Sequence, residues 1–173
     1  MRKPDEATFR RLLGEFSPAI QRLASSYEAD PALREDLVQE ILLAVWEAIP
    51  RFRGESSERT WLYRIAHNTA ISSAVSRKRL RGREEILPET FEPLSSSESP
   101  EWMLARDQQR QALLREIREL PLNDRRVMTL HLDGLSYAEI EQVTGLSQSA
   151  IATRLSRSRA RLIGRLGIQE VSK

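Results

Sequence analysis

The stretch GLSYAEIEQVTGLSQSAIATRLSR, residues 134–157, decides the fold of the C-terminal part of the chain. Ser136 and Glu139 match a capping box, in which the serine oxygen accepts a backbone N–H and the glutamate reaches back to the serine. The short helix that follows ends at Gly145, and Ser147 caps the next helix. The pattern predicts two helices joined by a tight turn.

The second of these helices is strongly basic. Five apolar residues are spaced so that they pack the two helices together: Ile140, Val143, Leu146, Ile151 and Leu155. The outward residues are of types that hydrogen-bond base edges and phosphates, namely Gln148, Ser149, Ala152, Thr153, Arg154, Ser156 and Arg157. Between Ser147 and Ile168 there are five arginines and no acid. A solvated basic helix is the alternative, but caps, spacing and charge favour a helix-turn-helix that binds the major groove of DNA.

Upstream of this motif the helical pattern continues. Residues 101–120 form a charged amphipathic helix that Pro121 closes. We expect Asn123 or Asp124 to cap a further helix, which ends at Asp133-Gly134.

Residues 88–100, PETFEPLSSSESP, separate the C-terminal block from the N-terminal one. Prolines and a serine run with no period are typical of a linker. Six acids and no base lie between Glu84 and Glu101, whereas five bases and no acid lie between Arg77 and Arg83. We therefore predict an acidic flexible linker over 84–101 between small helical domains at 1–83 and 102–173, and an all-α fold.

The N-terminal block has helical spacing over residues 9–27, where Pro18 either bends the helix or starts a new one. A second helix is expected from about Pro31 to Ile49. On a wheel of about 100° per residue, Leu37, Ile41 and Val45 form its core face. Asp36 and Glu40 lie on another strip, flanked by Leu43 and Trp46. The pattern alone favours a solvated acidic face, and the alternative is a docking surface for a basic partner.

Residues 51–68 hold a loop with aromatic and basic side chains, followed by a helix. Gly54 breaks the preceding helix, and Ser56 or Ser57 can cap the next one. Arginines that hold phosphates and aromatics that stack on bases are typical of single-strand nucleic-acid binding. In the alternative interpretation, Trp61 and Tyr63 are core residues, and the pattern supports both equally.

Composition excludes several classes of protein. The 173 residues contain no cysteine, and the longest apolar run, Ile41 to Trp46, is far too short to span a membrane. No signal peptide pattern opens the chain. The net charge of +2 implies no partner by itself. His67 and His131 lie in different blocks without ligand spacing, and no glycine-rich phosphate loop occurs, so we expect no catalytic residues, metal site or cofactor.

Two groups of motifs resemble a known family. Residues 36–46 together with 52–68 are similar to the second conserved region of bacterial sigma factors, and Leu120-Pro121 with residues 134–159 is similar to the fourth. Only a linker joins them, which is the layout of the extracytoplasmic-function (ECF) group.

The resemblance implies roles for particular residues. The clamp helices of the largest polymerase subunit would bind Asp36, Gln39, Glu40, Leu43 and Trp46. The minus-ten element would contact Phe52, Arg53, Gly54, Glu55, Ser56, Trp61, Asn68, Arg77 and Lys78. The minus-thirty-five element would be read by Gln148, Ser149, Thr153, Arg154, Arg157 and Arg159. Two residues depart from the family pattern: Ala152 replaces a frequent base, and Glu141 replaces a small alanine.

The resemblance also implies partners: core RNA polymerase, including its flap, promoter DNA and an anti-sigma factor. The chain would be a monomeric cytoplasmic protein at the nucleoid, without membrane insertion, which an anti-sigma factor could hold at the inner membrane face. It would direct transcription initiation, in a stress or envelope-signal response. A stand-alone helix-turn-helix regulator is the alternative, and it leaves the residues between Phe52 and Asn68 unexplained.

Overall fold

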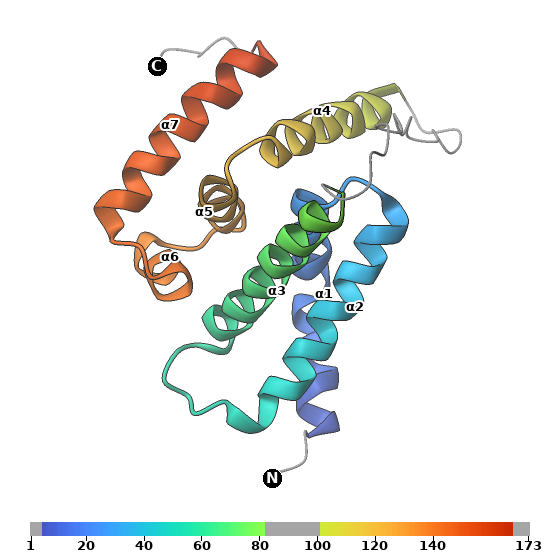
Figure 1. Cartoon of the computed structure of the whole chain (residues 1–173), viewed down its shortest axis with the longest axis vertical. Helices are drawn as coiled ribbons and strands as arrows, with labels where there is room; N and C mark the ends of the chain where they lie inside the picture. The colour runs from blue at the N-terminus through green and yellow to red at the C-terminus, as the bar shows by residue number, and fades with distance from the viewer. Residues whose placement is uncertain (1–4, 82–100, 168–173) are drawn as a thin grey trace.

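A computed structural model describes residues 5–81 and 101–167, and all regular structure in these ranges is helical (Figure 1). The prediction of an all-α fold is therefore confirmed. Helices α1 to α3 form an N-terminal half, and α4 to α7 form a C-terminal half. The expected linker, 84–101, lies outside the described residues except for Glu101, where α4 begins.

The N-terminal half comprises α1 (Glu6–Tyr27), α2 (Pro31–Ala48), the 3₁₀ turn η1 (Ile49–Arg51) and α3 (Glu58–Arg81). Asp5 and Asp30 cap α1 and α2 by accepting backbone N–H groups. Pro18 lies inside α1, which continues through it as one helix. The helices pack around fully buried apolar side chains, including Leu23, Leu37, Ile41 and Leu62.

The C-terminal half comprises α4 (Glu101–Arg118), α5 (Leu122–Leu132), α6 (Tyr137–Thr144) and α7 (Gln148–Leu166). The capping box at Ser136, the left-handed Gly145 with a φ of 75° and the Ser147 cap are confirmed. The expected cap of α5 is wrong, because Pro121 occupies that position. Asp124 lies in the first turn instead, and its carboxylate pairs with Arg154.

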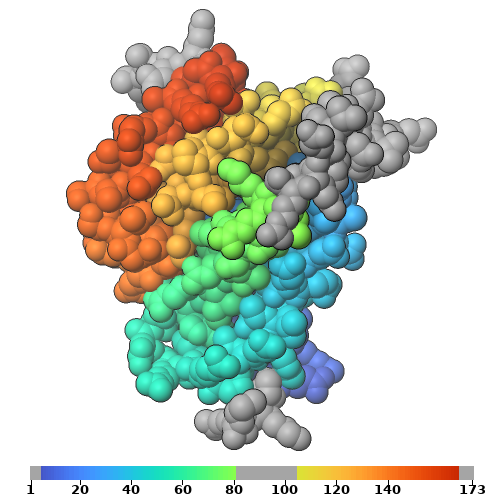
Figure 2. Space-filling view, in the orientation of Figure 1, coloured from blue at the N-terminus to red at the C-terminus, as the bar shows by residue number. Residues whose placement is uncertain are grey.

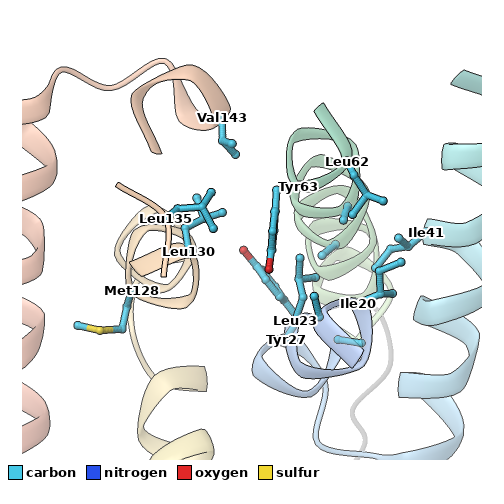
Figure 3. Close-up of a cluster of buried hydrophobic side chains, with 14 of the residues drawn as sticks. Ile20, Leu23, Tyr27, Ile41, Leu62, Tyr63, Met128, Leu130, Leu135 and Val143 are labelled. Carbon is cyan, nitrogen blue, oxygen red and sulfur yellow. The ribbon is translucent and has the colours of Figure 1, made fainter. Parts of the chain in front are cut away.

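The two halves pack directly against each other (Figure 2). Helix α3 contacts α6, and α1 contacts α4 and α5. Figure 3 shows Tyr27 and Tyr63 of the N-terminal half facing Leu130 and Leu135 of the C-terminal half. These side chains are all buried. The apolar core is therefore continuous between the halves.

Arginines supply the polar contacts around this core. Arg126 donates to the Val143 carbonyl at 2.7 Å and to Asn68 Oδ1 at 3.0 Å. Two arginines of the N-terminal half hold the α5–α6 turn: Arg59 donates to the Asp133 carbonyl at 2.6 Å, and Arg22 donates to its carboxylate at 2.8 Å. Burial lowers the pKa of Arg126, as expected for a guanidinium taken out of water.

His67 lies fully buried on α3 beside this interface. The Tyr27 hydroxyl and His67 Nδ1 lie 3.0 Å apart in a hydrogen bond. Burial, with a smaller effect of the Arg126 cation, lowers the pKa of His67 to about 3. The ring is therefore a neutral part of the core.

This burial predicts an acid-sensitive fold. An unfolded histidine has a pKa of about 6.5. Below that pH the unfolded chain therefore binds a proton at His67, which the folded chain does not bind. Between pH 7 and pH 5, His67 should therefore lower the free energy of unfolding by about 2 kcal/mol. Urea unfolding across this range measures the effect, and His67→Gln should lack that part of the pH dependence. An equally steep decline in the variant would contradict the assignment.

Arg126 provides a second test, this time of the contact between the halves. Arg126→Ala leaves the Val143 carbonyl without this donor and should lower the free energy of unfolding by about 2 kcal/mol. It should also raise the radius of gyration in small-angle scattering, since the halves lose the Arg126–Asn68 hydrogen bond. Arg64→Ala is the matched control, because Arg64 is exposed on the neighbouring helix. If the two variants behave alike, the closed arrangement does not depend on Arg126.

Candidate nucleic-acid interfaces

A concave surface that encloses a volume of about 550 Å³ lies between η1 and the start of α3. Phe52 and Trp61 form its aromatic part, with ring centroids 4.9 Å apart and an interplanar angle of 48°. Its other lining residues are Pro50, Arg51, Arg53, Glu55, Ser56 and Arg64. Gly54 has a φ of 73°, a left-handed conformation that favours glycine and lets the loop turn tightly. Aromatic faces next to guanidinium groups suit an unstacked base with its phosphates.

Trp61 and Tyr63, which the sequence could not assign to the core or to a binding surface, lie in different environments. Tyr63 is 2% exposed and belongs to the core, where burial raises its pKa to about 12. Trp61 is half-buried and lines the concave surface. The expected minus-ten residues did not include Arg51, although it belonged to the predicted basic loop, and sequence reasoning missed Arg64 at this surface. The signal was available, because Arg64 follows Trp61 by three residues on a helix and so shares its face.

The other expected minus-ten residues lie elsewhere on α3. Asn68 is exposed, but its Oδ1 accepts from Arg126 of the C-terminal half. Arg77 is half-buried, with its Nε 3.6 Å from a carboxylate oxygen of Glu28. Lys78 lines a groove on the side of α3 that faces the α4–α5 connection. The structure thus gathers Phe52, Arg53, Glu55, Ser56 and Trp61, but it does not bring Asn68, Arg77 and Lys78 to the same surface.

The acidic face of α2 is open to solvent. Asp36, Gln39 and Glu40 are exposed, and Leu43 is 58% exposed. Trp46 is half-buried, because it packs edge-on against Phe9 of α1 with the ring centroids 5.1 Å apart. Leu43 is thus a large apolar side chain that lies open to solvent beside these polar residues.

The recognition surface on α7 also departs in part from expectation. Gln148, Ser149, Thr153, Arg157 and Arg159 are exposed. Arg154 is half-buried, and its Nη1 lies 2.5 Å from Asp124 Oδ1. Arg159 Nη2 lies 2.5 Å from His131 Nε2, and burial together with that cation lowers the pKa of His131.

Glu141, which departs from the family pattern, has a defined contact. It is half-buried on α6, and its Oε2 accepts a hydrogen bond from Gln148 Nε2 at 2.9 Å. The carboxylate therefore lies at the edge of the helix-turn-helix rather than inside it. Its neighbours Ile140 and Val143 remain buried, so the packing is preserved.

Two further observations concern membrane-spanning helices and metal sites. Among the described residues, no helix combines the length and apolar character that a membrane span needs. Within residues 5–81 and 101–167, histidine, aspartate and glutamate side chains do not gather in groups that could hold a metal ion.

Comparisons with known proteins agree with the two-part arrangement. Residues 12–80 match the family model of sigma-70 region 2, and residues 110–162 match that of sigma-70 region 4. The ECF RNA polymerase sigma-E factor of Escherichia coli K12 is 33% identical over 166 residues, covering 92% of this chain and 86% of that protein. The RNA polymerase sigma-H factor of Pseudomonas aeruginosa is 31% identical, with the same coverage.

Solved structures share the fold of the whole chain. The sigma factor RpoE from Bartonella quintana, in complex with the anti-sigma factor NepR, has a TM-score of 0.75 at 24% identity and covers 94% of this chain and 99% of its own. CnrH, in complex with the cytosolic domain of CnrY, has a TM-score of 0.66 at 24% identity and covers 96% and 92%. With both conserved regions in order and relatives matched over nearly their full length, the chain belongs to the sigma-70 family, in its ECF group.

Proposed function

We propose that this sigma factor binds core RNA polymerase and directs it to promoters by reading duplex DNA with α7 and an unstacked minus-ten base at the Phe52–Trp61 surface. The observation that carries the proposal is the aromatic surface lined by Arg51, Arg53 and Arg64, in a chain that also presents an exposed recognition helix. Basic groups attract the DNA phosphates, and aromatic rings stack on the bases of single strands whatever their sequence. These residues bind, and none performs a reaction.

The acidic face of α2 is the proposed polymerase contact. It offers Asp36, Gln39 and Glu40 around the exposed Leu43, a combination that fits a basic partner helix. Half-buried Trp46 supports this face from the α1 side. The clamp helices of the largest subunit would occupy it, and the C-terminal half would contact the flap.

Promoter binding requires the halves to separate. Minus-ten and minus-thirty-five elements lie about 25 base pairs apart, or about 85 Å at about 3.4 Å per base pair. A closed chain of this length has a radius of gyration of only about 16 Å, so it cannot span both elements. Separation would also free Asn68 from Arg126.

A protein inhibitor would act by favouring the closed form. We propose an anti-sigma factor as a partner, because the closed arrangement resembles that of a sigma factor solved with one. The site of action would be the cytoplasmic nucleoid, or the inner membrane face while an anti-sigma factor holds the chain there. A stress or envelope signal would then release it.

Run-off transcription tests the function and the role of α2 together. Core polymerase with genomic promoter fragments should start at specific sites only when this chain is added. Asp36→Lys should abolish both the starts and co-elution with polymerase, because it places a cation where the partner is expected to be basic. Glu15→Lys, at an exposed acid of α1, is the control and should retain both. Normal loading of the Asp36→Lys protein would show that the docking face is wrong.

The Phe52–Trp61 surface makes a separate prediction about melted DNA. Phe52→Ala should weaken holoenzyme binding to a single-stranded minus-ten oligonucleotide by about tenfold, since stacking contributes about 1–3 kcal/mol per base. Phe52→Tyr keeps the ring and should restore binding. Fluorescence anisotropy with the oligonucleotide measures both. Equal binding by the alanine variant would remove this surface from the minus-ten contact.

A further inference from the structure

The arginines of α7 differ in what surrounds them. Three of the five contact side chains of other helices, and they are Arg154 with Asp124, Arg159 with His131 and Arg165 with Glu116. Arg157 is exposed, and no side chain among the described residues forms a hydrogen bond or ion pair with it. Five similar residues on one helix therefore have at least two kinds of role.

Their angular positions on α7 agree with this division. Ile151, Leu155 and Leu162 mark the buried face of the helix. At about 100° per residue, Arg154 lies about 80° from the middle of that face, whereas Arg157 lies about 140° away. Arg154 thus lies at the border of the core, while Arg157 shares the outward side with Thr153.

The Arg154–Asp124 pair is largely withdrawn from solvent. The two side chains are 28% and 16% exposed, and their charged atoms lie 2.5 Å apart. Asp124 also lies in the first turn of α5, where the helix dipole stabilises a carboxylate. Taking Arg154 away to contact a base would leave a partly desolvated carboxylate unpaired, which is costly.

We propose that Asp124 is a positioning residue for promoter recognition, which holds Arg154 as a strut between α5 and α7 and leaves the outward reading of the minus-thirty-five duplex to Arg157 and its neighbours. This proposal rests on the proposed function of the chain. It reverses the role expected for Arg154 from family resemblance. The Arg154 guanidinium sets the angle at which α7 enters the groove. Asp124 therefore affects specificity indirectly, by holding Arg154 in place.

The experiment uses the full chain with core polymerase. Its probes are a promoter fragment found by run-off transcription and the same fragment with an altered minus-thirty-five element. The measurement is the ratio of the two affinities, with its dependence on salt. Asp124→Ala and Arg154→Ala should each lower the ratio about tenfold, a loss of the size seen when one base contact fails. The exchanged pair Asp124→Arg with Arg154→Asp should restore it to within about threefold of the wild-type value.

Arg157→Ala is the contrasting variant. It should lower the ratio and also reduce the salt slope by about one, because a contact to DNA is lost. The variant Asp124→Leu with Arg154→Met replaces the pair by apolar side chains of similar size, and it should retain most of the ratio and the full salt slope. This second pair keeps the test decisive if the exchanged pair folds poorly, which thermal unfolding would show.

The outcomes separate this proposal from the function on which it rests. If neither double variant restores the ratio and Arg154→Ala reduces the salt slope by about one, then Arg154 contacts DNA and the proposal is overturned. If the wild-type chain itself shows no preference between the two fragments, the proposed function is wrong, and the inference that rests on it is wrong as well. A wild-type preference that either folded double variant retains supports the strut.

Discussion

The contact between the two halves of the chain constrains every functional surface. Guanidinium groups donate across it from both sides: Arg126 to Asn68 Oδ1, Arg59 to the Asp133 carbonyl and Arg118 to the Ser25 carbonyl. Burying charges costs solvation that such contacts only partly return. Interfaces between domains of one chain generally resemble transient protein–protein interfaces, which allow relative motion of the domains. In the closed form Asn68 stays exposed, but its Oδ1 accepts a hydrogen bond from Arg126 of the other half.

Local chemistry made much of the fold predictable. The capping box at Ser136, the glycine turn at Gly145 and the apolar stripe of α7 depend on residues within a few positions of each other, and the sequence displays them directly. The predicted cap of α5 was wrong because the helix begins earlier than residue type suggested. Pro121 takes the cap position, and Asp124 lies in the first turn, where it pairs with the distant Arg154.

Site residues were harder to assign because their partners come from elsewhere in the chain. Residue type and spacing placed Phe52 and Trp61 near one surface, and they do meet there. The same reasoning placed Arg77 with them, yet Glu28 of the α1–α2 connection pairs with it instead. No sequence pattern predicts the hydrogen bond from Arg126 to Asn68, because the two residues belong to different halves of the chain. Long-range pairing decides which cations remain available.

Pairing, rather than net charge, distinguishes arginines with structural roles from those suited to nucleic acid. The net charge of +2 does not predict which arginines bind nucleic acid. In the described part of the chain, ion pairs with acids are formed by Arg10, Arg11, Arg22, Arg77, Arg154 and Arg165. Among the arginines without an acid within 4 Å in those residues are Arg51, Arg53 and Arg64 at the aromatic surface and Arg157 on the outward side of α7. Because an unpaired guanidinium gains most from a phosphate or base, DNA should bind where the arginines form no ion pair with an acid of the protein.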